Sequence, residues 1–294
     1  MDLEVAVIGG DQRQIAVINA LAALVKFVKV YGHPETKLPE NVNITTNIDE
    51  ALTKVDLVVL PISGMNAAGM VRGVQVDQLI EVGSKLTALS KGTILLTGSL
   101  TLKWREVAEN AQLKVIEYAE NDEVAIPNAI PTAEGAVQLA MEELPITIEG
   151  STVIVIGFGR VGVAVARIFK ALQAKVIVVA RRESVMVAAQ AMGYQTLLLE
   201  LLANEINQAQ IIINTVPALV INEPLLQKIA SDALIIDLAS APGGTDFAAA
   251  EKLKLKAILA LGLPGKVAPQ TAGVILAQAI PKLIMDYLQN GGED

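Results

Sequence analysis

The sequence has 294 residues, which is enough for two domains of about 150 residues each. Apolar residues make up 52% and aromatic residues only 3%, so Ala, Val, Ile and Leu must form the cores, as is typical of parallel sheets that helices cover on both faces. The formal net charge of −8 argues against nucleic-acid binding. The absence of cysteine and the single histidine exclude a disulfide framework and a thiolate or multi-histidine site, so no metal is expected.

Short apolar runs alternate with helical patterns along the whole chain, which indicates βαβ units and parallel sheets. In the first half we predict strands at 3–8, 26–31, 55–60, 93–97 and 114–117. In the second half we predict strands at 152–156, 175–180, 210–214, 234–237 and 257–261. Both sets open with a strand that runs into a glycine turn, at Gly9-Gly10 and at Gly157. The prediction is an α/β fold with two Rossmann-like, doubly wound parallel-sheet domains and a cleft between them.

The predicted first domain comprises 1–125 together with about 272–294, and the second, cofactor-binding domain comprises 126–271. Pro127 and Pro131 mark the junction, and a helix with Thr132 as its N-cap is predicted at 132–144. The last helical pattern, 271–289, has nothing left to cover in the second domain. We therefore expect it to cross back to the first domain, with Pro281 kinking or dividing it. No positively charged signal segment and no run of about 18 apolar residues occurs, so a cytoplasmic protein without a membrane span is expected.

The clearest motif is a glycine fingerprint between a predicted strand and a predicted helix. It reads Gly157-Phe158-Gly159-Arg160-Val161-Gly162. Gly157 permits the tight turn, Gly159 lets the backbone approach a pyrophosphate, and Gly162 lets the helix pack closely on the strand. The start of the helix adds N–H groups and the positive end of its dipole. This context predicts a dinucleotide site, and the alternative is a glycine turn without a ligand.

The end of the next strand indicates which dinucleotide is preferred. NAD sites usually carry Asp or Glu about 20 residues further on, to hold the ribose hydroxyls, whereas here Ala180 is followed by Arg181 and Arg182. Arg181 can pair with a 2′-phosphate, and Ser184 can donate a hydrogen bond to it. We therefore predict NADP as the cofactor. The alternative is that the two arginines only form a solvated helix start.

Two further strand ends are predicted to complete the cofactor site. Thr215, Val216 and Pro217 follow one strand, where a loop can pass beneath the nicotinamide ribose. Asp237 ends the next strand, and it either contacts the cofactor or caps the turn that follows.

In the first half, the loops after three strands carry a polar set that suits a small carboxylate. It comprises Asp11 and Arg13 after the first strand, Ser63 after the third and Ser99 after the fourth. We expect these loops to converge, because the carboxyl ends of parallel strands share one edge of a sheet. Arg13 opposes the dipole of its helix, which suggests an anionic ligand; the alternative is an ion pair with Asp11, itself the expected helix cap.

Glu134 and Lys266 complete the catalytic candidates, together with Arg13 and Ser63. Glu134 is expected either to face the cleft or to be a surface acid, and Lys266 lies in the loop after the last strand. His33, in the polar loop 32–35, is expected to be solvated rather than catalytic. Without a usable histidine, a carboxylate, a lysine or water must move the proton. That limit suits the oxidation of a dihydropyridine-like ring, which aromatisation drives once the hydride is positioned.

Seven stretches carry a shared pattern across nearly the whole chain: 8–14, 60–63, 124–135, 157–162, 213–217, 237–247 and 262–273. The most specific are Asp237-Leu-Ala-Ser-Ala-Pro242-Gly-Gly and Gly262-Leu-Pro-Gly265. In this order the stretches resemble the dipicolinate synthase A-subunit family of spore-forming bacteria. The sequence departs from the family pattern at Ala241, where an arginine can occur, and at Gln270, where a lysine is common.

The resemblance implies an NADP-linked oxidoreductase subunit that forms dipicolinate (pyridine-2,6-dicarboxylate) from a dihydro- or hydroxytetrahydro-dipicolinate during sporulation. It also implies a small dicarboxylate substrate and a flavoprotein-like partner, the B subunit. It does not decide whether the chain forms a homo-oligomer. One alternative is a 2-hydroxy acid or amino acid dehydrogenase of the same layout, which normally needs a catalytic histidine. The other is an NADP sensor without chemistry, which would not need Arg13 and Ser63.

Overall fold

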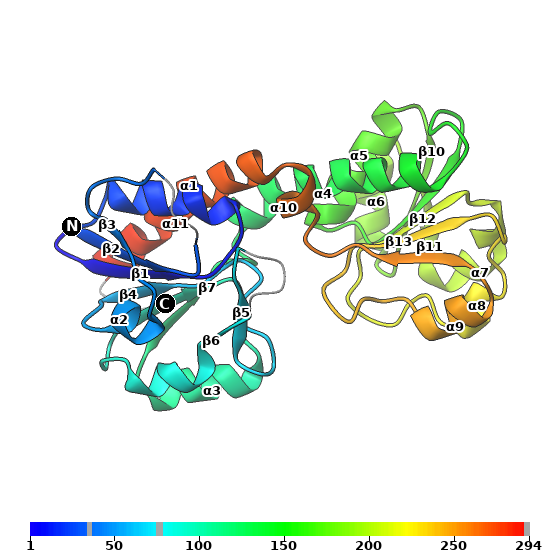
Figure 1. Ribbon diagram of the computed structural model, residues 1–294. Coiled ribbons are helices and arrows are strands. Elements are labelled where there is room, and N and C mark those ends of the chain that lie inside the picture. Colours follow the sequence, from blue (N-terminus) through cyan, green and yellow to red (C-terminus); the bar gives the residue numbers. More distant parts are fainter. Residues whose placement is uncertain (34–36, 75–78, 291–294) are drawn as a thin grey trace. The chain divides into compact units, whose positions relative to one another are not determined.

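Each half of the chain forms a parallel six-stranded sheet with helices on both faces (Figure 1). The computed structural model describes residues 1–33, 37–74 and 79–290. It divides into unit 1, formed by Met1–Pro127 and Ala268–Asp294, and unit 2, formed by Asn128–Val267. Among the described residues, no helix is both long and apolar enough to cross a membrane.

The sheet of unit 1 has the order β3-β2-β1-β4-β7-β8, and all neighbouring strands are parallel. Its strands are β1 (Glu4–Ile8), β2 (Phe27–Tyr31), β3 (Val42–Ile44), β4 (Leu57–Val59), β7 (Ile94–Thr97) and β8 (Lys114–Glu117). The chain builds outward from β1 in one direction and then, from β4, in the other. Ligands of doubly wound sheets bind where this direction changes, so the loops after β1 and β4 frame the expected crevice of unit 1.

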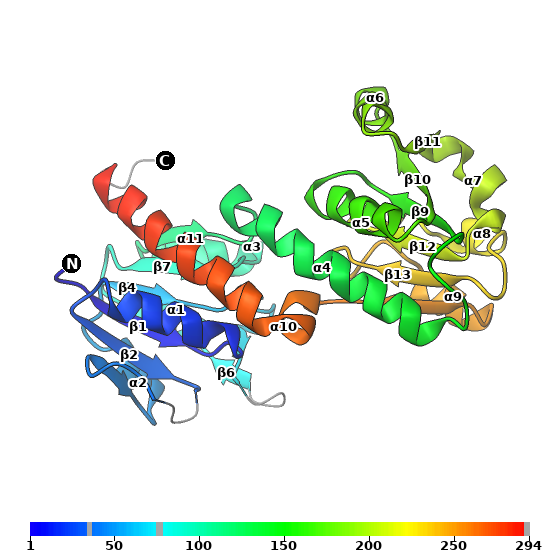
Figure 2. The same ribbon diagram turned by 90° about the horizontal axis from the view of Figure 1, so that it is seen from above.

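One face of this sheet is covered by α1 (Arg13–Ala22) and α11 (Pro269–Gln289), which lie side by side (Figure 2). The contact is close, since a Cβ on Gly273 would lie 3.2 Å from the Arg13 carbonyl oxygen. The opposite face is covered by α2 (Ile48–Leu52) and α3 (Leu102–Asn110). The predicted return of the C-terminal helix to the first half is confirmed, and Pro281 lies inside α11 without dividing it.

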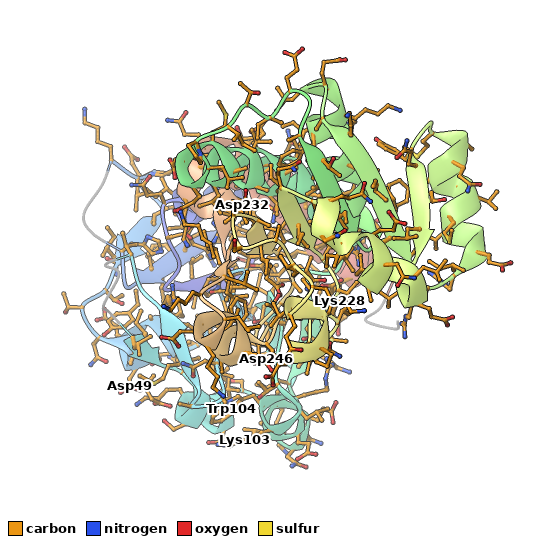
Figure 3. All side chains as sticks on the ribbon, turned by 90° about the vertical axis from the view of Figure 1, so that its right-hand side faces the viewer. Asp49, Lys103, Trp104, Lys228, Asp232 and Asp246 are labelled. Carbon is orange, nitrogen blue, oxygen red and sulfur yellow. The ribbon has the colours of Figure 1, made fainter. Side chains whose placement is uncertain are left out.

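A two-stranded antiparallel sheet, β5 (Met70–Arg72) with β6 (Leu79–Glu81), extends unit 1 and was not predicted. It leads into a 3-10 helix at Gly83–Ala88. The buried Trp104 ring packs where side chains on Gly69 and Gly83 would collide with it, and the Lys103 ammonium lies 4.4 Å from the ring centroid (Figure 3). The Gly10 N–H donates to the Arg72 carbonyl oxygen at 2.6 Å, so β5 covers the turn between β1 and α1.

Unit 2 repeats the topology with the order β11-β10-β9-β12-β13-β14. Its strands are β9 (Thr152–Ile156), β10 (Lys175–Ala180), β11 (Gln195–Leu198), β12 (Ile211–Asn214), β13 (Leu234–Asp237) and β14 (Lys256–Leu259). Every predicted strand is found within two residues or so of its expected bounds, and β3 and β11 are additional. The predicted α/β class with two doubly wound sheets is confirmed.

The helices of unit 2 also cover both faces of its sheet. They are α5 (Arg160–Ala171), α6 (Glu183–Ala191), α7 (Leu202–Glu205), α8 (Glu223–Leu226), α9 (Phe247–Lys252) and α10 (Leu263–Val267), with 3-10 turns at Leu199–Leu201 and Ile206–Gln208. Residues of α4 and α5 pack on one face and residues of α7, α8 and α9 on the other.

The helix predicted to begin at Thr132 begins much earlier, and that expectation was wrong. It is α4 (Asp122–Glu143), which contributes to both units. The Asn121 side chain accepts a hydrogen bond from the Glu123 N–H at 2.9 Å and so supports the true start of the helix. Pro127 and Pro131 lie inside α4, where each removes one N–H donor without ending the helix. The Thr132 hydroxyl donates back to the Asn128 carbonyl oxygen at 2.9 Å, as in a helix interior.

Candidate functional site

The glycine turn after β9 has the geometry that its three glycines predict. Gly157 has a φ of +93°, and a Cβ there would collide with the Thr215 hydroxyl. A Cβ on Gly162 would collide with the Gly157 carbonyl group, so this glycine lets α5 approach the turn. By contrast, a Cβ on Gly159 would meet no atom within 4 Å. Packing therefore explains Gly157 and Gly162 but not Gly159, whose missing side chain leaves open space.

That open space lies at the start of α5. Gly159 is the N-cap residue and has no side chain with which to cap the helix, so the helix start presents backbone rather than a capping group. A pyrophosphate needs a close approach to backbone N–H groups at the positive end of a helix dipole. The turn therefore fits the phosphates of a dinucleotide. Around it, Phe158 is half-buried and contacts Tyr194 edge to face, Val161 packs against the core, and Arg160 is exposed.

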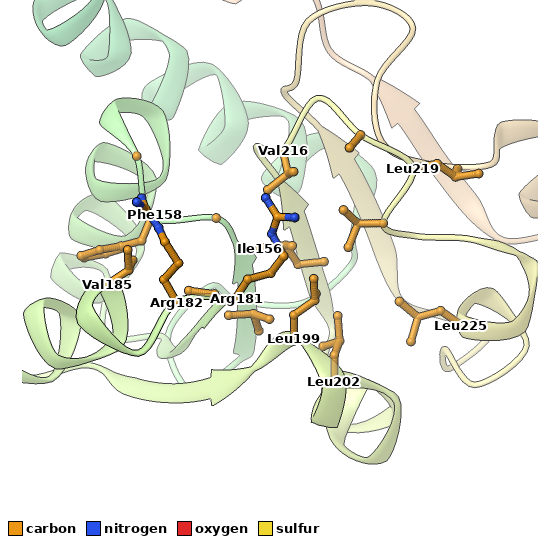
Figure 4. Close-up of a pocket in the computed structure, with 16 residues that line it drawn as sticks. Ile156, Phe158, Arg181, Arg182, Val185, Leu199, Leu202, Val216, Leu219 and Leu225 are labelled. Atoms are coloured by element: carbon orange, nitrogen blue, oxygen red, sulfur yellow. The ribbon is translucent and has the colours of Figure 1, made fainter.

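A cavity of about 480 Å³ opens beside this turn (Figure 4). It is lined by the turn, the end of β10, and apolar residues from three further segments: Ile156, Gly157, Phe158, Gly159, Val179, Ala180, Arg181, Arg182, Val185, Leu199, Leu202, Val216, Ala218, Leu219, Val220 and Leu225. Leu219 at its edge is 63% exposed. An apolar cavity with a few polar groups at its rim is the usual form of a cofactor site.

Arg181 and Arg182 supply the positive charge at this rim. Both are exposed, and neither has a carboxylate partner among the residues that the structure describes. Figure 4 shows Arg181 extending toward Val216 and Arg182 toward Phe158. Ser184 is exposed in the first turn of α6 and is not among the residues that line the cavity.

The loop after β12 is held against β9. The Thr215 hydroxyl donates to the Ile156 carbonyl oxygen at 2.9 Å, so its hydrogen is already engaged. Val216 lines the cavity, whereas Pro217 is exposed and does not. The Asn214 side chain donates to the Val216 carbonyl oxygen at 3.1 Å and accepts from the Val216 N–H at 3.0 Å, which fixes the shape of this loop.

Asp237 is fully buried, and both of its carboxylate oxygens accept hydrogen bonds from groups of the chain. One carboxylate oxygen accepts from the Asn214 amide at 3.0 Å and from the Ala239 N–H at 3.1 Å. The other accepts from the Gly244 N–H at 2.8 Å and from the Thr245 hydroxyl at 2.6 Å. Of the two predicted roles, this arrangement favours the one in which Asp237 organises the turn at 238–245.

In unit 1, the predicted substrate residue Arg13 is paired with Asp11. The Arg13 Nε lies 2.8 Å from Asp11 Oδ1, and Nη2 lies 2.7 Å from Oδ2. The Arg13 backbone N–H also donates to Asp11 at 3.0 Å. Burial alone would raise the pKa of Asp11, but the hydrogen bonds and charge of Arg13 outweigh it and hold this pKa below its ordinary value. The anion expected beside Arg13 is thus supplied by the chain.

The other polar candidates of unit 1 lie at the same edge of the sheet. The loops that carry Ser63 and Ser99 are in contact, since the Gly98 N–H donates to the Pro61 carbonyl oxygen at 3.2 Å and the Met65 N–H donates to the Ser99 carbonyl oxygen at 3.4 Å. Both serines are exposed. Next to them, the buried Tyr118 hydroxyl donates to the Leu60 carbonyl oxygen at 2.8 Å. Sequence patterns did not reveal Tyr118, because nothing local marks it as buried.

Glu134 and Lys266 are both exposed side chains of unit 2. Glu134 lies on α4 and Lys266 lies on α10. The two helices touch beside these residues, where a Cβ on Gly135 would lie 3.0 Å from the Leu263 Cβ.

His33 is not solvated, contrary to the sequence prediction. It is 9% exposed, and its Nε2 lies 2.6 Å from the Gly9 carbonyl oxygen. Burial lowers the pKa of His33 below its ordinary value, although the Gly9 carbonyl and the Asp11 charge act in the opposite direction. Pro34 and Glu35, which were predicted to belong to the same loop, lie outside the described residues.

Comparison with known proteins agrees with the two-unit structure. Residues 4–119 match the N-terminal domain of the dipicolinate synthase A subunit, and residues 131–263 match the NAD binding domain of D-isomer specific 2-hydroxyacid dehydrogenases. The dipicolinate synthase A subunit of Bacillus subtilis (strain 168) is 36% identical over 293 residues, covering 99% of each chain. The crystal structure of the dipicolinate synthase A subunit from Bacillus halodurans is 37% identical, with a TM-score of 0.89 over 96% of this chain and 97% of that chain.

The crystal structure of the corresponding dipicolinate synthase protein from Bacillus subtilis is 35% identical, with a TM-score of 0.88 over 99% of this chain and 98% of that chain. The domain match in unit 2 and the glycine turn described above identify a site for a nicotinamide dinucleotide, and they support an oxidoreductase role for the chain. The sequence and structural matches extend over both units, and the chain therefore belongs to the dipicolinate synthase A-subunit family.

Proposed function

We propose that the chain is the NADP-dependent subunit of an enzyme that forms dipicolinate from a dihydro- or hydroxytetrahydro-dipicolinate. The main support for this proposed reaction is the 36% identity to a dipicolinate synthase A subunit over 99% of the chain. The name of that relative further supports a partner protein, the B subunit, while a role in sporulation follows from the same resemblance.

The preference for NADP rests on the end of β10. Ala180 leaves no carboxylate there to hold ribose hydroxyls or to repel a 2′-phosphate, and Arg181 and Arg182 border the same cavity. A guanidinium binds phosphate through parallel charge-assisted hydrogen bonds and can stack on a planar base. The apolar side chains Leu199, Leu202 and Leu219 line the cavity and would shield the base from water.

The substrate residues are proposed at the switch point of unit 1. Arg13 would share its guanidinium between Asp11 and a substrate carboxylate, while Ser63 would donate a hydrogen bond. When bound, the dinucleotide supplies the hydride acceptor. Glu134 and Lys266 are exposed on touching helices, and we propose them as the groups that move the accompanying proton.

Cofactor titrations test the first part of this proposal. We expect NADP to bind at least about tenfold more tightly than NAD, which corresponds to roughly 1.4 kcal/mol. Arg181→Ala should remove most of this preference while it leaves NAD affinity nearly unchanged. Arg167→Ala is the matched control, because Arg167 is exposed on α5 but does not line the cavity. Equal wild-type affinities for the two dinucleotides would refute the NADP assignment.

Product formation tests the reaction itself. The purified chain is incubated with NADP and hydroxytetrahydro-dipicolinate, with and without the B subunit, and dipicolinate is quantified. We expect dipicolinate to form with the B subunit present and NADPH to accumulate in proportion. A 2-hydroxy acid dehydrogenase remains the second candidate because of the domain match at 131–263. NADP reduction with a 2-hydroxy acid and none with the dipicolinate precursor would favour that candidate.

A further inference from the structure

His33 has one ring nitrogen engaged and one without a partner. Its Nε2 lies 2.6 Å from the Gly9 carbonyl oxygen, and because a carbonyl oxygen only accepts, Nε2 must carry the hydrogen. In the neutral ring, Nδ1 is then an acceptor. This Nδ1 is buried and has no hydrogen-bond partner in the described part of the chain. The single histidine of the sequence thus has a fixed tautomer with an unused basic nitrogen.

A second buried polar atom without a partner lies at the same turn. Gln14 is 2% exposed, and its Nε2 amide nitrogen has no acceptor among the residues described. The Cβ, Cγ and Cδ atoms of Gln14 each lie 3.1 Å from the place that a Cβ on Gly10 would occupy, so the side chain lies over Gly10. Gln14 and His33 therefore flank two consecutive glycines, Gly9 and Gly10. Most buried polar side-chain atoms in proteins have a partner, so two exceptions at one turn require an explanation.

The charges around His33 favour an anion at this place. Asp11 in the turn is the charged group that acts on the His33 ring, and Arg72 on β5 meets the same turn through its backbone carbonyl oxygen. The Asp11 charge is already compensated by its bidentate ion pair with Arg13. An additional anion would consequently meet a local excess of positive charge once His33 is protonated.

We propose that Gln14 and His33 form a carboxylate subsite in unit 1 that takes up one proton from solvent when it is filled. The proposal rests on the proposed function, because the carboxylate would be one end of the dicarboxylate substrate, with Arg13 near the other. Protonated His33 donates through Nδ1, and the Gln14 amide donates through Nε2. A carboxylate has two oxygens that can accept these two hydrogen bonds. Since both atoms are enclosed by the chain, binding requires these two side chains to rearrange.

The direction of the pH dependence follows from this arrangement. Burial keeps the pKa of His33 low without a ligand, and a neighbouring carboxylate raises it. Affinity should therefore be greatest below the pKa of the unfilled site. It should fall as the pH rises through the higher pKa of the filled site, by up to about tenfold per pH unit for one linked proton.

Nuclear magnetic resonance of the imidazole nitrogens tests the proposal in the unaltered protein, because every histidine signal comes from His33. Near pH 7 and without ligand, the His33 ring should be neutral, with its hydrogen on Nε2. Saturation with dipicolinate should convert the ring to the doubly protonated form. Pyridine-2,6-dicarboxamide, which has a similar shape and no charge, should leave the ring neutral. A ring that stays neutral with dipicolinate bound overturns the subsite.

Calorimetry with variants provides the second test. Titration of dipicolinate in buffers of different ionisation enthalpy should show proton uptake by the wild type and none by His33→Gln, whose amide can still donate to the Gly9 carbonyl oxygen. Gln14→Met removes the donor at similar size and should weaken binding about tenfold while proton uptake persists. Unchanged pH dependence in His33→Gln refutes the subsite even if affinity falls. Absence of dipicolinate binding by the wild type at every pH contradicts the proposed function instead.

Discussion

Gly159→Ala should separate cofactor binding from folding, because the structure gives this glycine no packing role. Its φ of −86° and ψ of −164° are accessible to alanine, and a Cβ there would meet no atom within 4 Å. The methyl group would instead project into the open space at the start of α5. If a pyrophosphate passes through that space, the substitution must push it away from the backbone N–H groups.

The expected magnitudes differ accordingly. Alanine is a poorer N-cap residue than glycine, so the free energy of unfolding should fall by less than about 1 kcal/mol. Losing one charge-assisted hydrogen bond between backbone and phosphate costs about 2 kcal/mol, which weakens dinucleotide binding by about 30-fold. Gly162→Ala provides the contrast. Its Cβ would collide with the Gly157 carbonyl group, so this variant should lose stability, by about 2 kcal/mol or more.

The assay combines dinucleotide titration with urea unfolding for the wild type and both variants. Gly159→Ala should bind weakly and unfold almost as the wild type does, and Gly162→Ala should unfold at a lower urea concentration. Dinucleotide affinity within about threefold of the wild type in a folded Gly159→Ala protein would show that the phosphates do not pass this position. A large loss of stability in that variant would show that the open space is filled by the chain itself.

Two further substitutions test how buried hydrogen bonds support the candidate sites. Asp237→Asn should lower the free energy of unfolding by at least about 2 kcal/mol, because the Gly244 N–H and the Thr245 hydroxyl lose a charged acceptor. Chemical denaturation followed by circular dichroism measures this change, and a loss below about 0.5 kcal/mol would show that the network is unimportant. Tyr118→Phe should lower the free energy of unfolding by about 1 to 2 kcal/mol, because it leaves the buried Leu60 carbonyl oxygen without its donor. The fluorescence of Trp104, the single tryptophan and a residue of unit 1, follows this unfolding, and an unshifted unfolding transition would contradict the reasoning.

The sequence determined those features that depend on neighbouring residues. Alternating apolar runs and helical patterns located ten strands of the two large sheets, because a buried parallel strand needs a continuous apolar segment. The spacing of Gly157, Gly159 and Gly162 located the dinucleotide turn, because each glycine serves a requirement within one strand-turn-helix segment. The short edge strands β3 and β11 were missed.

The tertiary structure decided what depends on distant segments. Pro127 and Pro131 suggested a break, but packing of Ala129, Ala133 and other residues of α4 in a core keeps the helix continuous. Whether Arg13 meets Asp11 or a ligand depends on side-chain geometry that no sequence pattern encodes.

His33 is the sharpest case. A polar loop predicts a solvated side chain, whereas the fold places His33 against Gly9 at the end of the neighbouring strand, beside a turn that β5 covers. Burial is a property of the surfaces that come together, not of the residue or its sequence neighbours. For that reason the sequence could locate the dinucleotide turn, but only the folded chain decides which polar groups of the candidate sites are already paired with other groups of the chain.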